Sequence, residues 1–128
     1  MSIFNFVSAA ISSGIVNLSS IAARTSTVTG TGVDVSSYTG PLLVVQDVGT
    51  VSGTTPTLDG KLQDSADDSS YADVTGATFT QVTASNSVQT LQVGADSLRK
   101  YVRWVGTIAG TTPSFTCGVK VIGIKASV

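Results

Sequence analysis

Short runs of apolar and β-branched residues, separated by polar or glycine-containing segments, follow one another along most of the chain. This pattern predicts strands rather than helices. We expect strands at 33–35, 41–48, 57–63, 77–83, 88–93, 100–108 and 115–125. Residues 41–48 lack a clear alternation, which indicates a strand covered on both faces. About seven short strands predict a single all-β domain, a β-sandwich of the immunoglobulin-like or jelly-roll type.

An internal repeat supports this fold class. The segment Val48 to Leu58 (VGTVSGTTPTL) returns 57 positions later as Val105 to Phe115 (VGTIAGTTPSF), with seven identities. In each copy an apolar run enters a Gly-Thr-Thr-Pro segment and a second apolar run leaves it. We interpret the copies as two strand-loop-strand units. In the first unit, we expect residues 57–63 to pair with the strand that precedes the loop.

The N-terminal stretch differs from the rest, because the first charged residue is Arg24. This shift predicts an apolar N-terminal arm over 1–30 and a β-sandwich domain over 31–128. Apolar residues in the arm follow a spacing of three and four, so the arm is either a weak amphipathic helix or extended. The residues with this spacing are Phe4, Val7, Ile11, Leu18 and Ile21.

Four interpretations of the arm remain open. A secretory signal would explain the small residues at 21–23, but a basic region is missing. A transmembrane helix needs about 20 mostly apolar residues, whereas this stretch carries many Ser and Asn side chains. The arm could fold back onto its own domain. We favour burial of the arm against another subunit, because exposed apolar patches usually mark contacts.

Composition excludes several functions. The chain has no His and a net charge of −1, and its only basic cluster is Arg99, Lys100 and Arg103. Nucleic acids are bound by larger groups of Lys and Arg, so we expect no nucleic-acid partner. We also expect no membrane partner. The single Cys117 lies in a strand-like alternation and is expected to be a buried apolar residue.

No motif predicts catalysis. Asp64, Asp67, Asp68 and Asp73 lie close together in sequence, but their spacing is not that of an EF-hand, so we interpret them as a solvated acidic turn rather than a metal site. The many Ser and Thr residues have no His to act as a base. Trp104 is expected in the core, and Tyr71 and Tyr101 could belong to a binding face or to sheet packing. We therefore expect no enzyme activity, no metal and no cofactor.

Three segments together resemble small virion structural proteins of tailed bacteriophages, of the head decoration or cement type. They are Gly32 to Val45, Leu62 to Val74 and Arg99 to Arg103. The similarity covers roughly residues 31–124 and omits the arm. The second and third segments also resemble discoidin-type jelly rolls, some of which bind sugars.

The resemblance implies a protein on the capsid surface of a virion that binds the major capsid protein and stabilises the head, often as a homotrimer. We expect the arm to carry the contact, through Phe4, Phe6, Val7, Ile11 and Ile15. Two alternatives are a tail or head-tail connector component and a carbohydrate-binding module. For the latter, Tyr71 beside Asp67 and Asp68 is the best candidate site.

Overall fold

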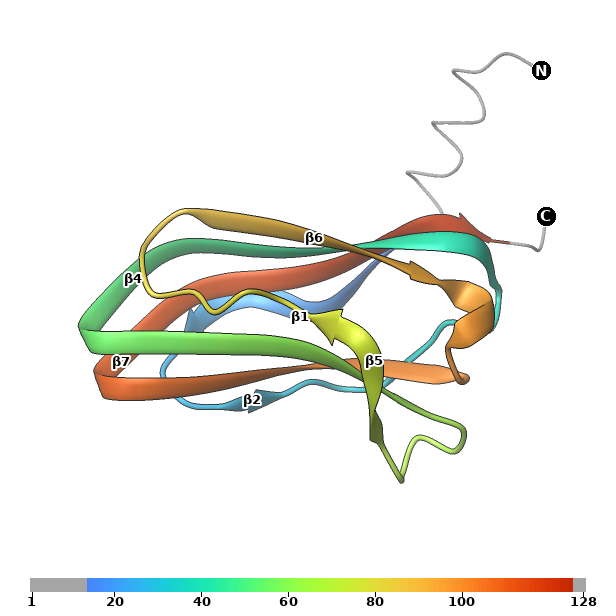
Figure 1. The fold of residues 1–128 in the computed structure, drawn as a ribbon, viewed down its shortest axis with the longest axis horizontal. Coiled ribbons are helices and arrows are strands. Elements are labelled where there is room, and N and C mark those ends of the chain that lie inside the picture. The colour runs from blue at the N-terminus through green and yellow to red at the C-terminus, as the bar shows by residue number, and fades with distance from the viewer. Residues whose placement is uncertain (1–13, 126–128) are drawn as a thin grey trace, which may run out of the picture.

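The computed structural model describes residues 14–125, and this part of the chain is almost entirely β-structure (Figure 1). All strand pairs are antiparallel. The elements are β1 (Ile15–Arg24), β2 (Val28–Thr29), β3 (Val33–Asp34), β4 (Tyr38–Ser65), β5 (Ala72–Thr78), β6 (Ser87–Gly94), the short 3-10 helix η1 (Ala95–Ser97) and β7 (Tyr101–Lys125). The all-β prediction is confirmed.

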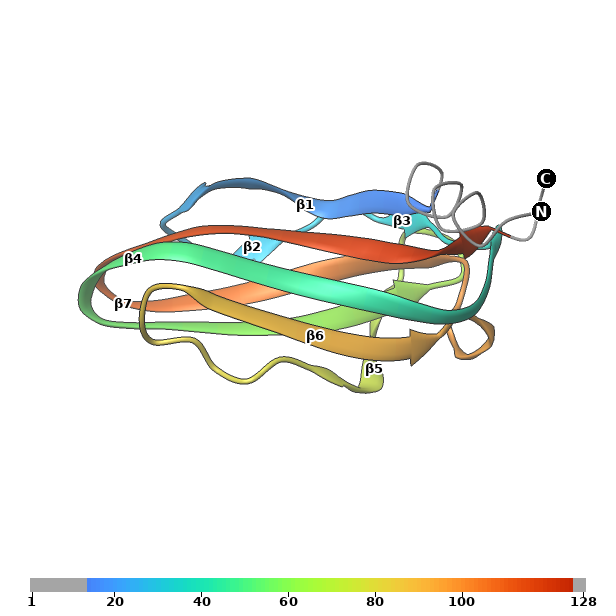
Figure 2. The ribbon, with the colours of Figure 1, turned by 90° about the horizontal axis from the view of Figure 1, so that it is seen from above.

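Two long, bent strands organise the fold. β4 and β7 lie side by side, and both turn back at the same end of the molecule (Figures 1 and 2). The first half of β4 and the second half of β7 form layer one with β1 and β6. The other halves form layer two with β2, β3 and β5. One continuous sheet thus folds over itself, as is consistent with the predicted β-sandwich; the choice between immunoglobulin-like and jelly-roll topology stays a prediction.

The internal repeat forms the corner of this folded sheet. Each Gly-Thr-Thr-Pro segment lies inside one strand, and the two segments pair with each other, Thr54 opposite Thr111. The flanking pairs Val51–Phe115 and Leu58–Ile108 are equivalent under the 57-residue shift. The two copies are therefore related by a local twofold arrangement. β4 and β7 bend side by side at the same place, and the same sequence forms the bend in both strands.

Two expectations about the repeat were wrong. The Gly-Thr-Thr-Pro segments are bends within β4 and β7 rather than loops between separate strands. Residues 57–63 pair with β7 and not with the strand that precedes their own bend. The physical reason is that a bend of this kind carries a strand into the other layer, where the neighbouring bent strand supplies its hydrogen-bond partners.

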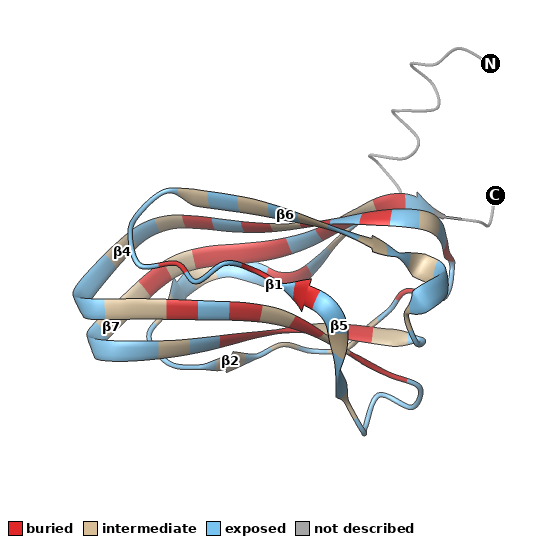
Figure 3. Cartoon of the chain, in the orientation of Figure 1, coloured by how far each residue is buried: buried red, intermediate tan, exposed pale blue. Residues whose placement is uncertain are grey.

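The core lies between the two layers. Leu42, Val44 and Val48 point inward from layer one, and Leu58 and Leu62 point inward from layer two. Figure 3 shows the resulting alternation of buried and exposed residues along β4 and β7. Trp104 and Cys117 are fully buried, as predicted from the sequence.

The described part of the predicted arm belongs to the sheet. Residues 15–24 form β1, which pairs with the second half of β7, so the expected boundary at residue 30 falls inside the folded body. The helical spacing is wrong for this stretch, because Leu18 is buried and Ile21 is exposed on a strand. Residues 1–13 and 126–128 lie outside the described residues.

Candidate interaction surface

An apolar row crosses the outward side of layer one. Ile122 of β7 lies directly between Ile15 of β1 and Leu43 of β4. Ile15 is 42% exposed and Leu43 is 40% exposed, although their sequence neighbours in the strands point into the core. Because these side chains stand on paired strands, they present a fixed apolar surface. We call Ile15, Leu43 and Ile122 the outer apolar row.

The outer apolar row corrects the expectation for residues 41–48. Both faces of this segment were predicted to be covered, but the structure buries only the inner one. Leu42, Val44 and Val48 are buried, whereas Leu43 and Asp47 are exposed. The outer side of β4 is therefore accessible to solvent at Leu43 and Asp47.

The chain enters the sheet beside this row. The backbone oxygen of Gly14 accepts hydrogen bonds from the Tyr38 hydroxyl at 3.1 Å and from the Gly123 N–H at 3.0 Å. Burial raises the pKa of Tyr38 above its usual value, so this hydroxyl stays protonated, and able to donate, into more alkaline solution. These two bonds hold the Gly14 backbone in place next to Ile15.

The structure places only one of the five predicted contact residues. Ile15 begins β1 and belongs to the outer apolar row. The other four, Phe4, Phe6, Val7 and Ile11, lie outside the described residues. Their role in a contact stays a prediction.

A hollow of about 340 Å³ adjoins the row on the same face. Its lining includes Ile21, Val45 and Ile122, together with the charged Asp47 and Lys120. The hollow forms where β1 loses its regular register with β7 between Ser19 and Ala22, so that Ile21 passes close over a glycine of β7. The outer side of layer one is therefore both apolar and concave.

The four aspartates of the predicted acidic turn have separate partners. Buried Asp64 forms an ion pair with Arg99 at 2.9 Å. Asp67 accepts bonds from the N–H groups of Ser70 and Ser69 and from the Ser65 hydroxyl, and the bond from Ser70 makes the largest contribution to lowering its pKa. In residues 14–125 no group of three or more potential metal-ligating side chains is found.

Asp73 belongs to a polar ladder on the outer side of layer two. It accepts a hydrogen bond from the Gln63 side chain at 2.8 Å and pairs with Lys61 at 3.0 Å, and both contacts lower its pKa. Gln63 in turn accepts two hydrogen bonds from Arg103. This face is thus covered by mutually satisfied polar side chains.

Tyr71 is held by its neighbours rather than left open. The Arg103 guanidinium lies 3.9 Å from the centre of its ring, and the Tyr71 hydroxyl donates a hydrogen bond to Asp68. A Cβ atom on Gly32 would collide with both Asp68 and the hydroxyl of Tyr71, so the backbone approaches this pair closely. Since sugars stack on free aromatic faces, Arg103 competes for one face of the predicted platform.

The two remaining candidates from the sequence, the basic cluster and Cys117, are either engaged by other residues or buried. Arg99 pairs with Asp64, and Lys100 lies 3.9 Å from Asp34, so the basic cluster is divided among different partners. Cys117 is buried between the layers, and this burial raises its thiol pKa. A buried thiol with a raised pKa is a poor nucleophile.

Sequence reasoning missed the outer apolar row. The sequence did contain a signal. In residues 41–48 the even-numbered positions, beginning with Leu42 and Val44, supply the whole inner face of the strand, so Leu43 has to point outward. Its neighbours in the row, Ile15 and Ile122, are 107 positions apart in the sequence and come together only through the pairing of β1 with β7.

Comparison with family models and with curated proteins found no match. No helix in residues 14–125 is long and apolar enough to cross a membrane.

Proposed function

We propose that this chain is a structural protein of a virion, specifically a head decoration or cement protein of a tailed bacteriophage. It binds assembled capsid subunits as a homo-oligomer and stabilises the head. The observation that carries the proposal is the outer apolar row, in which Ile15 and Leu43 are exposed on paired strands. The resemblance of three sequence segments to such proteins supplies the specific role.

The two outer faces of the molecule support a binding role for layer one. Layer two carries the polar ladder of Lys61, Gln63, Asp73 and Arg103, whose members satisfy one another in solvent. Layer one carries the outer apolar row and the adjoining hollow. Burial of apolar area stabilises a complex by about 25 cal/mol per Å² before the costs of ordering are subtracted. The outer side of layer one is therefore the face that gains from being covered.

The stabilising effect on a head follows from mass action. A protein that binds the closed capsid lattice, but not its separated subunits, stabilises the lattice by its binding free energy at every occupied site. This mechanism needs a rigid module and a contact surface, and it needs no catalytic group. Because the binding free energy is added at every occupied site, even a modest affinity stabilises the shell against separation into its subunits.

A variant at Leu43 tests the contact. Leu43→Lys places a charge in the outer apolar row, and burial of that charge against a capsid subunit would be costly. We expect at least about tenfold weaker binding to purified heads, measured by cosedimentation, because about 1.4 kcal/mol corresponds to a factor of ten. Since Leu43 is already 40% exposed, the fold itself tolerates the change.

Thr107→Lys is the matched control, because Thr107 is exposed on β7 in layer two. We expect this variant to bind heads like the unchanged protein. A chain lacking residues 1–13 then separates the contribution of these residues from that of the outer apolar row. Wild-type binding by Leu43→Lys would refute the assignment of this face, and binding to tails instead of heads would favour the connector alternative.

A further inference from the structure

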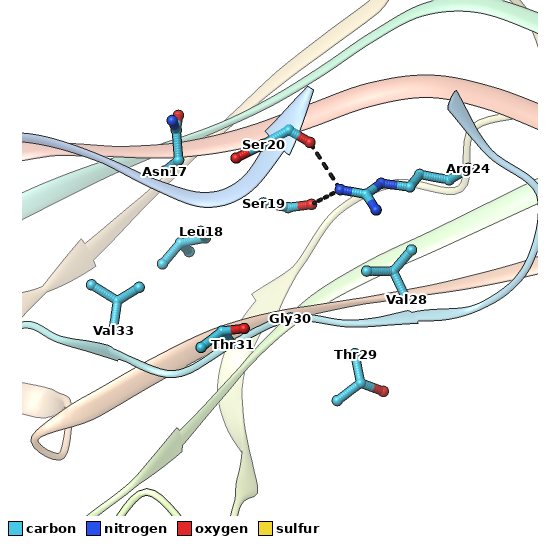
Figure 4. Close-up of a pocket in the computed structure, with 10 residues that line it drawn as sticks. All are labelled: Asn17, Leu18, Ser19, Ser20, Arg24, Val28, Thr29, Gly30, Thr31 and Val33. Carbon is cyan, nitrogen blue, oxygen red and sulfur yellow. Dashed lines mark hydrogen bonds between the residues drawn. The ribbon is translucent and has the colours of Figure 1, made fainter. Parts of the chain in front are cut away.

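A polar cleft of about 330 Å³ lies between β1 and the segment that carries β2 and β3 (Figure 4). It shares Asn17, Ser19 and Ser20 of β1 with the hollow beside the outer apolar row, but its other wall is formed by residues 28–33, which do not line that hollow. Its lining combines hydroxyl groups with one guanidinium and contains no carboxylate. The polar lining residues are Asn17, Ser19, Ser20, Arg24, Thr29 and Thr31.

Arg24 is the only charged residue of this cleft. It ends β1, and its side chain turns back along the strand toward Ser19 and Ser20 (Figure 4). Nη2 of Arg24 donates a hydrogen bond to the Ser20 backbone oxygen at 3.0 Å, and a longer one of 3.4 Å to the Ser19 hydroxyl. No carboxylate in residues 14–125 lies within ion-pair distance of Arg24.

Among residues 14–125 the Nε–H of Arg24 has no acceptor, although the atom is buried. Buried donors in proteins almost always have a partner, and a charged donor without one is costly. The Nε–H and one Nη2–H of a guanidinium form a fork that matches two oxygens of a carboxylate or phosphate. In Arg24 the Nε side of this fork is unused, and Nη2 is shared between the Ser20 oxygen and the long contact to Ser19.

We propose that the cleft is a binding site for a small oxyanion, a carboxylate or a phosphate group, held by the Arg24 fork. The anion takes the Nε–H and replaces the long Ser19 contact at Nη2, while the bond to Ser20 keeps the guanidinium in place. No lining carboxylate repels it. The cleft volume lies at the lower end of the range for small-molecule sites.

The test follows the Nε–Hε NMR resonance of Arg24 during titration of the full chain with acetate and, separately, with inorganic phosphate. Sodium chloride at equal ionic strength is the reference. We expect a saturable shift with at least one of the two oxyanions. The titration that saturates shows whether the cleft prefers the planar carboxylate or the tetrahedral phosphate. A shift that matches chloride and does not saturate would overturn the proposal, because it would show that neither oxyanion binds in the cleft.

Two variants extend the test. Arg24→Lys keeps the charge and loses the fork, so backbone resonances around the cleft should report at least about tenfold weaker binding, because one charge-assisted hydrogen bond of the pair is lost. Lys120→Gln removes an exposed charge outside this cleft and should leave binding unchanged. Equal affinity of Arg24→Lys and the unchanged protein would also overturn the proposal; if that variant does not fold, the titration of the unchanged chain alone settles the matter.

Discussion

Trp104 is buried with the help of two glycines. Gly60 and Gly106 face each other across β4 and β7, and a Cβ atom on Gly106 would lie 2.3 Å from the indole ring. The indole Nε1 donates a hydrogen bond of 3.1 Å to the side chain of Gln46, which comes from the other layer. The largest core residue and its buried polar partner thus connect the two layers. Sequence analysis predicted the burial of Trp104, but not the role of the glycines or of Gln46, because their distant positions meet only in the fold.

Gly106→Ala tests this packing. The added methyl group forces the Trp104 ring to move in a closely packed core, and overpacking of this kind typically costs about 1–3 kcal/mol. We expect a loss of about 2 kcal/mol in the free energy of unfolding, measured with chemical denaturant. Gly49→Ala is the control, since its Cβ would meet its nearest neighbour at 3.6 Å, an ordinary contact. Equal stability of the two variants would contradict the packing described for Trp104.

Tyr71 provides a prediction about pH. Desolvation and the hydrogen bond to Asp68 raise its pKa from 10.0 to about 12, although Arg103 acts in the opposite direction. The folded state therefore keeps the Tyr71 proton in a range where the unfolded chain releases it. This contribution to stability is fully present below pH 10 and is lost as the pH rises toward 12.

Ultraviolet absorbance during an alkaline titration measures this effect. We expect Tyr71→Phe to remove a tyrosine transition near pH 12, and to remove part of the decline in stability between pH 10 and 12. A Tyr71 transition close to pH 10 would show that the pair with Asp68 does not form in solution. The same result would reopen Tyr71 as a free aromatic surface for a sugar.

At the scale of the elements, the bent pair β4 and β7 determines the fold. The repeat was visible in the sequence, and its two copies were expected to form the same local structure. Its pairing was not predictable, because a loop and a bend within a strand use the same Gly, Thr and Pro residues. Only the partner strand distinguishes them, and in both copies that partner is the other copy. Likewise, the place of residues 15–24 at the edge of the sheet depends on a free edge of β7 that sequence patterns do not reveal.

The twofold arrangement of the corner predicts matched effects of two substitutions. Gly53 has φ of +110° and Gly110 has φ of +122°, a backbone conformation that Ala rarely adopts. A Cβ atom at either position would also approach backbone oxygen of the opposite copy, at 2.6 Å for Gly53 and 2.8 Å for Gly110. We expect Gly53→Ala and Gly110→Ala each to lower the free energy of unfolding by about 2 kcal/mol or more. Denaturant unfolding of both variants measures this.

Thr55→Asn is the matched control at the same corner. Thr55 has φ of +46°, where Asn is better tolerated than a β-branched residue. We expect unchanged stability, or a gain of up to about 1 kcal/mol. A large loss for Gly53→Ala with none for Gly110→Ala would mean that the two bends are not equivalent.

At the scale of the whole molecule, the two outer faces differ in a way that the pattern of single strands could not reveal. The fold class and several core residues followed from alternation and composition, whereas four of the expected strands proved to be halves of β4 and β7. The outer apolar row required the register of β1, β7 and β4 together, because each of its residues comes from a different strand. The Arg24 cleft likewise depends on how β1 and the β2–β3 segment lie relative to each other (Figure 4).

The most direct test of the proposed function is a cryo-EM reconstruction of tailed-phage virions that carry this chain, the particles to which we assign it. We predict density for the two-layered module on the outer surface of the head, with Ile15, Leu43 and Ile122 turned toward a capsid subunit and the polar ladder of layer two facing solvent. Density only in the tail or connector, or a module on the head with the outer apolar row facing solvent, would contradict the proposal.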